Sequence, residues 1–402
     1  MIILVINCGS SSVKYQLLDM ESDEKYTLRA KGIVEKIGLP EGKLTHKPVG
    51  KQPLVRTLPI PDHKVGMKLV LDALVDPDCG VLEKLSDIDA VGHRIVQGAE
   101  FFSSSALVDD DVLRKIELCS DFAPLHNPAN LLGIRAIENV LPGVPQAATF
   151  DTAFHQTMEA VSYLYALPYK YYEQYRIRRY GAHGTSHQYV SQRGIRFAGL
   201  DPDNSRVITC HIGNGSSVTA VRNGKCVDTS MGFTPLEGMI MGTRCGSIDA
   251  SIVPYIMKKE GLTPDEMTAM MNKQSGFLGL SGLTSDMRDM CTLAGQGNER
   301  AALVLRKVVL DIAKLVGAYI AEMNGVDLIV FTAGIAENNP WLRRDVCAHF
   351  SYMGVRIDDA VNDAAREETM ISAPDSRVKV AMIPTDEELV IARDTMHLVA
   401  GK

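Results

Sequence analysis

The sequence predicts an α/β protein with mixed sheets and two related halves. Short apolar runs typical of buried strands alternate with longer stretches of helical periodicity along the 402 residues. Residues 4–19 and 207–225 repeat one pattern: an apolar run, a turn of small residues, Ser-Ser-Val and a second apolar run. A chain of this length usually exceeds one hydrophobic core. We therefore expect two domains, each carrying one copy of this glycine-serine hairpin.

Strands and helices follow from the spacing of apolar residues. Strands are predicted over residues 2–7, 12–19, 88–92, 145–150, 206–212, 216–222, 327–333 and 378–383. Helices are predicted over residues 62–76, 109–119, 129–140, 184–199, 248–260, 263–273, 298–323, 358–369 and 386–399. Start signals such as Asp109 and Pro264 support several of these helices. The stretch 38–61 is rich in Pro, Gly and Lys, which predicts a surface excursion.

The repeat also predicts where the domains divide. It places a boundary near residue 150, between the two copies of the hairpin. The last predicted helix follows Pro384, is short, and needs a surface to pack on. We expect it to return to the first domain, which would then comprise 1–150 plus 386–402, with 151–385 as the second domain.

Composition limits the classes of partner. Hydrophobic residues make up 46% of the chain and charged residues 23%, as in an ordinary globular protein. A net charge of -7 disfavours nucleic-acid binding by bulk electrostatics. The eight cysteines lack zinc-ligand spacing and indicate reduced thiols. No apolar run is long enough for a signal peptide or a membrane span, so we expect a cytoplasmic protein without nucleic-acid or membrane partners.

Both hairpin turns are suited to phosphate. Glycine lets the backbone approach a ligand closely, and successive N–H groups with serine hydroxyls form a concave set of donors. Standard nucleotide motifs are absent, because Leu44 follows Gly-Lys where a Walker loop needs Ser or Thr, and the turn at 213–218 lacks the third glycine of a dinucleotide loop. Two such turns on opposite sides of a cleft would hold the phosphates of a nucleotide.

Charged residues in turns are the next candidates. Asp151 directly follows an apolar strand, where a carboxylate can hold Mg²⁺ through water or accept a proton; a helix N-cap is the structural alternative. Arg94, Arg244 and Lys14 lie in apolar or glycine-rich contexts. The planar fork of arginine suits a carboxylate or a phosphoryl group, with a structural ion pair as the alternative.

A strand running into Thr-Ala-Gly at residues 326–339 could bind a nucleoside. Gly334 would let a flat ring approach the backbone, although an ordinary strand-to-helix turn predicts the same sequence. Four histidines also lie beside Gly, Pro or Ser in predicted loops: His126, His183, His187 and His211. His183 and His187 have the spacing of metal ligands, but the glutamate of the zinc motif is missing. We expect hydrogen-bond donors to an anion rather than a zinc site.

Several of these motifs occur together and in the order of one family. On them the chain resembles the acetate and propionate kinases, the short-chain acyl kinases of the sugar kinase, Hsp70 and actin superfamily. The motif segments are residues 6–14, 92–94, 124–128, 150–155, 183–187, 211–217, 241–244, 286–288, 334–338 and 384–388. The resemblance implies two ribonuclease-H-like domains around a nucleotide cleft. It further implies a homodimer that reversibly phosphorylates acetate to acetyl phosphate, with ATP/ADP as co-substrate and Mg²⁺ or Mn²⁺ as metal.

The resemblance also assigns roles to matching positions. Catalytic roles fall to Asp151, His183 and Arg244, and metal binding to Asn7 and Glu387. The substrate-binding positions are Arg94, Val96, Leu125, His126, Ala182 and Pro235. The nucleotide-binding positions are Ser10, Ser12, Lys14, His211, Ile212, Gly213, Asn214, Gly215, Asp286, Met287, Arg288, Gly334, Ile335, Ala336, Glu337 and Asn338.

Departures from the family pattern concern the acyl group most. Gln97, Ala99 and Ala336 differ from residues common at the matching positions. Ala182 stands where many relatives carry Phe beside the acyl methyl group, which predicts an enlarged pocket and some use of propionate. Three alternatives stay open: propionate as the main substrate, a sugar or glycerol kinase on the same fold, and a non-catalytic actin-like ATP-binding protein.

Overall fold

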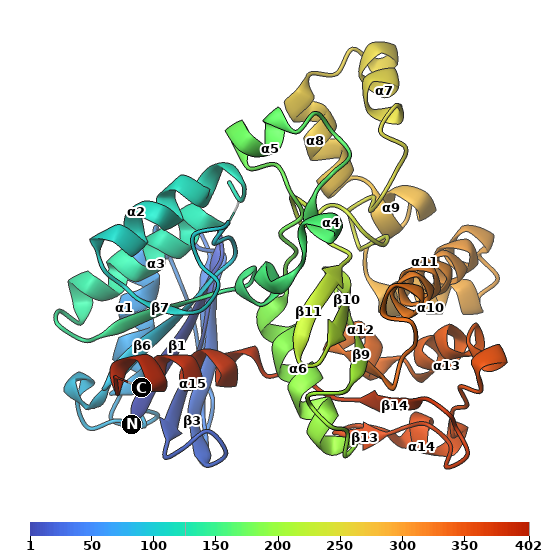
Figure 1. The fold of residues 1–402 in the computed structure, drawn as a ribbon. Helices are drawn as coiled ribbons and strands as arrows, with labels where there is room; N and C mark the ends of the chain where they lie inside the picture. Colours follow the sequence, from blue (N-terminus) through green and yellow to red (C-terminus); the bar gives the residue numbers. More distant parts are fainter. Residues whose placement is uncertain (125, 402) are drawn as a thin grey trace. The chain divides into compact units, whose positions relative to one another are not determined.

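The computed structural model describes residues 1–124 and 126–401, and its internal contacts divide the chain into two units (Figure 1). Unit 1 comprises Met1–Phe154 and Asp386–Lys402, and unit 2 comprises His155–Thr385. Each unit contains a mixed sheet with helices packed against it, as an α/β sequence pattern predicts.

Unit 1 is built on a sheet with the strand order β5-β4-β3-β2-β1-β6-β8-β7. Its strands are β1 (Ile2–Cys8), β2 (Ser12–Met20), β3 (Tyr26–Glu35), β4 (Gly42–Pro48), β5 (Leu54–Leu58), β6 (Ala90–Ile95), β7 (Ala106–Leu107) and β8 (Gln146–Phe150). Its α-helices are α1 (His63–Leu74), α2 (Asp110–Leu118), α3 (Asn127–Val140) and α15 (Glu387–Val399). Single 3-10 turns cover Leu85–Asp87 and Cys119–Asp121.

The central strand of unit 1 is buried on both faces. Leu4 and Ile6 of β1 share a core with side chains of α1 and α3. On the other face, α15 packs against β1, β6 and β8 and is drawn in red across this sheet in Figure 1. The contact is close, because a Cβ on Gly92 of β6 would lie 2.5 Å from Thr395 Oγ1 and 2.6 Å from Ile391 Cγ2. The C-terminal helix is therefore part of the core of unit 1.

Unit 2 is built on a sheet with the strand order β11-β10-β9-β12-β14-β13. Its strands are β9 (Arg206–Ile212), β10 (Ser216–Arg222), β11 (Lys225–Thr229), β12 (Leu328–Thr332), β13 (Thr369–Met370) and β14 (Lys379–Met382). Its α-helices are α4 (Ala160–Tyr163), α5 (Lys170–Tyr175), α6 (Gly184–Phe197), α7 (Ile252–Glu260), α8 (Pro264–Lys273), α9 (Gly276–Ser281), α10 (Met287–Gly295), α11 (Glu299–Met323), α12 (Ala333–Asn338), α13 (Pro340–Ala348) and α14 (Asp359–Ala364). The 3-10 turns are Ala153–Thr157, which spans the division between the units, and Ser351–Met353.

The two faces of the sheet in unit 2 differ in polarity. Helix α11 packs on the face that carries Ile208 and Cys210 of β9 and Val218 of β10. Helix α6 packs on the opposite face of β9 and β12, where alternation along β9 and β10 places Thr209 and Ser217. A polar layer therefore lies between α6 and an otherwise apolar sheet.

The central five strands of the two sheets have one topology. The orders β3-β2-β1-β6-β8 and β11-β10-β9-β12-β14 correspond strand for strand. In both, the first three strands in chain order form antiparallel pairs. The fourth strand pairs parallel with the first, and the fifth pairs parallel with the fourth. The predicted duplication, the two glycine-serine hairpins and the ribonuclease-H-like fold class are confirmed.

Some predicted elements were wrong. The stretch 38–61 is not a surface excursion, because β4 and β5 extend the sheet of unit 1 across most of it. Lysines occupy the exposed positions of β4, so its composition resembles that of a loop although its burial alternates. The predicted helix at 358–369 ends at Ala364, because Ala365 turns extended and Thr369–Met370 joins the sheet as edge strand β13. Strands β3 and β11 were missed.

Replacing Gly92 with alanine is expected to lower the free energy of unfolding of unit 1 by about 1–3 kcal/mol, the usual cost of overpacking. The added methyl would meet Thr395 and Ile391 of α15. Hydrogen exchange of peptides from β6 and α15 measures the loss locally. Gly295→Ala is the control, since its Cβ would meet no heavy atom within 4 Å; equal protection in both variants would contradict the packing described.

Candidate active site

Four of the predicted residues lie at one edge of the sheet in unit 1. Asn7 is the penultimate residue of β1, Arg94 is the penultimate residue of β6, and Asp151 directly follows β8. Glu387 is the first residue of α15. Strands β1, β6 and β8 run parallel, so their carboxyl ends fall at the same edge, as at ligand sites of α/β proteins.

Arg94 and Asp151 orient each other. The guanidinium donates from Nε to Asp151 Oδ1 at 3.1 Å and from Nη2 to Oδ2 at 2.6 Å, while Glu387 Oε2 lies 3.5 Å from Nε. Asp151 is only 1% exposed. Burial disfavours the cation, but Asp151, Glu387 and Glu388 more than offset this, so the pKa of Arg94 is raised. Sequence analysis gave a structural ion pair as the alternative role of Arg94. The pair with Asp151 is present and holds Arg94 at the sheet edge.

The residues predicted for the metal suit Mg²⁺ by their chemistry. An amide oxygen from Asn7 and a carboxylate from Glu387 are hard oxygen donors, and Mg²⁺ usually keeps waters and substrate phosphates as further ligands. Glu387 lies between Asp386 and Glu388. Burial is the larger cause that raises the pKa of Glu388, and the charge of Glu387 raises it further. Burial likewise raises the pKa of Asp386. This turn therefore concentrates negative charge that a cation would stabilise.

The remaining predicted residues of unit 1 that the structure describes lie either in the β1–β2 hairpin or beside α3. Ser10 is exposed in the β1–β2 turn, where Gly9 N donates to Ser12 O at 2.8 Å, and Lys14 is exposed on β2 opposite Asn7. Val96 N donates to Asn130 Oδ1 of α3. His126 is the N-cap residue of α3, and Leu125 lies outside the described residues.

Unit 2 gathers two predicted histidines around its glycine turn. His183 precedes α6 with φ of 58°, a left-handed conformation that is strained for a side chain larger than glycine. Its ring stacks on His211 of β9 with centroids 4.1 Å apart. A Cβ on Gly215 would lie 3.4 Å from His183 Nε2, and one on Gly213 would lie 4.0 Å from His211 Nε2. Both rings therefore present Nε2 toward the turn.

Arg244 reaches the same turn. Its Nη1 would lie 3.5 Å from a Cβ on Gly215 and donates to Pro235 O at 3.1 Å. Burial lowers the pKa of Arg244, and within the described residues no Asp or Glu lies within 4.0 Å to balance its charge. A largely buried guanidinium without a counter-ion is a binding position for an anion. The turn residue Asn214 accepts from Gly242 N at 3.4 Å and so joins the two loops.

The predicted nucleotide segment at α12 forms a tight turn after β12. Ala333 has φ of 68°, and its N–H donates to Glu337 Oε1 at 2.7 Å. The Glu337 carboxylate thus orders the backbone of this turn. A Cβ on Gly334 would meet no atom within 4 Å, so one side of the backbone is open. Ile335 and Ala336 belong to the same short helix, and Asn338 closes it by donating to Gly334 O.

The other nucleotide segment begins α10. Asp286 caps this helix by accepting from Arg288 N at 2.8 Å and also pairs with the Arg288 guanidinium at 2.6 Å. These bonds lower the pKa of Asp286 to about 2. The side chain of Arg288 is 89% exposed, whereas Met287 is buried. Arg288 is therefore the accessible charged group of this segment.

A buried arginine that the sequence analysis missed supports the α12 turn. Arg343 of α13 is fully buried and donates to Ala336 O at 2.6 Å, to Glu337 O at 2.9 Å and to Asn362 at 2.6 and 2.7 Å. Burial and the charge of Arg366 lower its pKa to about 10. The signal in the sequence was a basic residue on the apolar face of a short helix.

The residue expected to widen the acyl site is buried among sulfur-containing side chains. Ala182 forms a small apolar cluster with Met231 and Met241. Its carbonyl accepts from His155 Nε2 at 3.0 Å, which fixes the backbone just before His183. Met231 and Met241 therefore pack beside Ala182.

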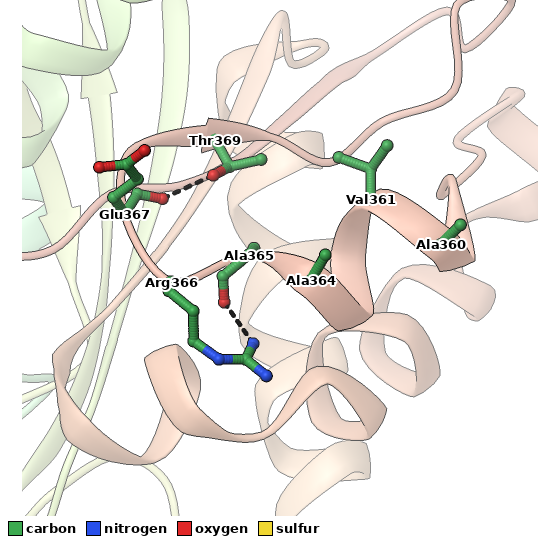
Figure 2. Close-up of a pocket in the computed structure, with 7 residues that line it drawn as sticks. All are labelled: Ala360, Val361, Ala364, Ala365, Arg366, Glu367 and Thr369. Carbon is green, nitrogen blue, oxygen red and sulfur yellow. Dashed lines mark hydrogen bonds between the residues drawn. The ribbon is translucent and has the colours of Figure 1, made fainter.

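A surface pocket of about 560 Å³ lies elsewhere in unit 2 (Figure 2). Figure 2 shows Ala360, Val361 and Ala364 of α14 along one side and Thr369 of β13 along another. The guanidinium of Arg366 donates to Ala365 O at its rim. None of the predicted site residues lines it.

The described helices include none long and apolar enough to cross a bilayer.

Comparison with known proteins agrees with this arrangement. The acetokinase family model matches residues 2–393. The acetate kinase of Thermotoga maritima is 55% identical over 400 residues, covering 99% of this chain and 98% of the relative, and that of Caldanaerobacter subterraneus is 52% identical with 99% of each covered. The crystal structure of Porphyromonas gingivalis acetate kinase has a TM-score of 0.94 at 47% identity, covering 99% of each chain. A propionate kinase from Francisella tularensis gives 0.92 at 41%, with the same coverage.

Two units of one topology, related to enzymes that transfer phosphoryl groups, define a kinase of the actin and Hsp70 fold class. Nearly the whole chain matches a single family within that class. The chain belongs to the acetokinase family.

Replacing Asp151 with asparagine is expected to lower the free energy of unfolding of unit 1 by about 3 kcal/mol, because Arg94 would lose the carboxylate that balances it. Urea unfolding followed by circular dichroism measures the loss, while Trp341, the single tryptophan, reports on unit 2. The matched control is Asp72→Asn, which breaks an exposed ion pair with Lys68 and should cost less than about 1 kcal/mol. Equal losses in the two variants would contradict the assignment.

Proposed function

We propose that this protein catalyses the reversible, ATP-dependent phosphorylation of acetate to acetyl phosphate with Mg²⁺. Full-length relatives that are 50–55% identical carry the name acetate kinase, which supports this activity. The observation that most supports this reaction is the position of Arg244, a guanidinium without a counter-ion among the described residues. It lies at the glycine turn 213–215, beside the Nε2 atoms of His183 and His211. Such a set of fixed donors stabilises charge on a transferring phosphoryl group.

Unit 1 would supply the acceptor and metal groups. Asp151 engages Nε and Nη2 of Arg94, which directs the Nη1 hydrogens to the carboxylate of the acid. Asp151 would thereby orient the acid, or assist proton transfer. Asn7 and Glu387 would hold Mg²⁺, which neutralises charge on the β- and γ-phosphates when bound.

Unit 2 would supply the nucleotide and phosphoryl groups. The turn at 213–215 and the α12 segment at 334–338 offer backbone donors and an open face for the nucleotide. Arg244, His183 and His211 would donate to the equatorial oxygens of the γ-phosphoryl group. A carboxylate oxygen of the acid attacks phosphorus in line and ADP leaves, so no enzyme nucleophile is needed. Inversion at a chiral γ-phosphorus is the expected signature, and retention would contradict direct transfer.

The environment we propose is a reducing one, the cytoplasm. The eight cysteines are free thiols, and most of them are buried. Burial raises the pKa of Cys119 and of Cys347 to about 12. Such thiols are poor nucleophiles, which fits structural residues rather than disulfide partners.

A hydroxamate assay with ATP and Mg²⁺ over a panel of acids tests the function. We expect product with acetate and propionate, a weaker signal with butyrate, and loss of signal when Mg²⁺ is chelated. The family resemblance implies a larger ring at the position of Ala182, and one methylene in an apolar pocket is worth about 1–3 kcal/mol. We therefore expect kcat/KM to fall no more than about 200-fold from acetate to propionate. A thousandfold fall would refute the enlarged pocket. Because only acyl phosphates form hydroxamates, glycerol and glucose are tested by ADP formation, and activity with them in place of acids would overturn the proposed function.

We also propose a homodimer, whose mass by sedimentation would be twice 43.9 kDa. Exposed apolar side chains around α4 and α5, among them Val161 at 85% and Tyr175 at 58%, are candidates for the interface. Val161→Asp should weaken association, whereas Tyr352→Asp, at a site of unit 2 that is 78% exposed, should not. A wild-type monomer at micromolar concentration would refute the dimer.

A further inference from the structure

The polar layer under α6 contains a chain of four hydrogen-bonded side chains. Ser217 Oγ lies 2.8 Å from His183 Nδ1 and 2.7 Å from His187 Nε2. His187 Nδ1 in turn lies 2.7 Å from Thr209 Oγ1. His187, Ser217 and Thr209 are completely buried. The chain therefore links a buried threonine to the histidine that faces the glycine turn.

The direction of these hydrogen bonds follows from the buried end. Burial lowers the pKa of His187 well below its ordinary value, with His155 and His211 adding to the effect, so this ring is neutral and carries one proton. Among the described residues, the Thr209 hydroxyl has His187 Nδ1 as its one hydrogen-bond partner. A buried donor left unpaired costs about 1–3 kcal/mol. Thr209 therefore donates to Nδ1, and the His187 proton resides on Nε2.

The remaining steps are then determined. His187 donates from Nε2 to Ser217 Oγ, so the single hydroxyl proton of Ser217 is directed to His183 Nδ1. A ring nitrogen that accepts a hydrogen bond carries no proton, so the proton of neutral His183 lies on Nε2. That is the nitrogen that faces Gly215 beside Arg244 Nη1.

A second hydroxyl chain reaches the stacked ring of His211. Thr385 Oγ1 donates to Ser186 Oγ at 2.8 Å, and Ser186 Oγ lies 2.8 Å from His211 Nδ1. Ser186 accepts from Thr385 and so directs its own proton to Nδ1. The proton of neutral His211 then lies on Nε2, which faces the turn at Gly213.

We propose that Ser217 and Ser186 are positioning residues that hold His183 and His211 as neutral imidazoles with the proton on Nε2. Two parallel N–H donors are thereby fixed beside Arg244 before the anion binds, and fixed donors need no reorganisation during transfer. The positive charge of Arg244 and the 4.1 Å stacking both disfavour a second charged ring. The identity of the anion rests on the proposed function, whereas the tautomers of His183 and His211 do not depend on it.

Long-range proton–nitrogen correlation spectra of the ligand-free full chain with ¹⁵N-labelled histidine test the tautomers directly. Wild-type His183 and His211 should both show a protonated Nε2 and an accepting Nδ1. In Ser217→Ala only the His183 pattern should be lost, and in Ser186→Ala only that of His211. A proton on Nδ1 of either wild-type ring, or an unchanged pattern in both variants, would overturn the proposal.

Steady-state kinetics give an independent readout. Ser217→Ala should reduce kcat by about 10- to 100-fold, the range typical for outer partners of functional histidines, while KM for ATP and acetate stays nearly constant. Ser217→Thr, which keeps the hydroxyl, should restore both kcat and the tautomer pattern. Unchanged kcat in Ser217→Ala would overturn the role in catalysis.

A matched control separates positioning from packing. Thr219 lies two residues along β10 on the same face, and its hydroxyl pairs with Thr229 Oγ1 at 2.7 Å rather than with a histidine. Thr219→Val should leave the tautomers and kcat as in wild type; an equal loss there would show that Ser217 acts only through packing. A wild-type protein that cannot phosphorylate acetate would refute the proposed function, while the spectra would still decide the tautomers.

Discussion

Parallel pairing of the central strands is the constraint on which the site depends. Because β6 and β8 follow the direction of β1, and β12 and β14 follow that of β9, the strand ends in each unit meet at one edge. Backbone hydrogen bonds in the sheets thus set the spacing of groups far apart in sequence. Arg94 meets Asp151 in this way, and His211 meets the α12 turn. Burial of these polar groups is tolerated because each is held by hydrogen bonds or ion pairs.

The duplicated topology also makes α6 and α15 equivalent, although the motifs at the start of these two helices are not similar in sequence. Helix α6 packs on β9 and is preceded by its N-cap residue His183, and α15 begins with Glu387 on the corresponding face of unit 1. Asn7 and His211 occupy equivalent positions when the two hairpins are aligned on their glycines. The equivalent position at the start of the helix therefore carries a carboxylate in unit 1 and an imidazole in unit 2.

Sequence reasoning recovered what depends on local pattern. The hairpins, the long amphipathic helices and the family motifs were all visible in the spacing of residues. It failed at β4, where Lys, Gly and Pro on an outer strand resemble a loop, and at β13, where pairing with β14 overrides a helical pattern. Arg343 and Thr209 were also out of reach, because their roles arise only from contacts made by the folded chain. The alternation of polar residues in β9 and β10 was the available signal for the layer under α6.

The return of α15 to unit 1 has a consequence for biosynthesis. Residues 1–154 leave the ribosome long before the helix that covers one face of their sheet and carries Glu387. Until α15 emerges, that sheet face is an exposed apolar surface that chaperones can recognise. A chain stopped before residue 386 lacks both this cover and the carboxylate. The fold of unit 1 is therefore completed only after α15 has been synthesised.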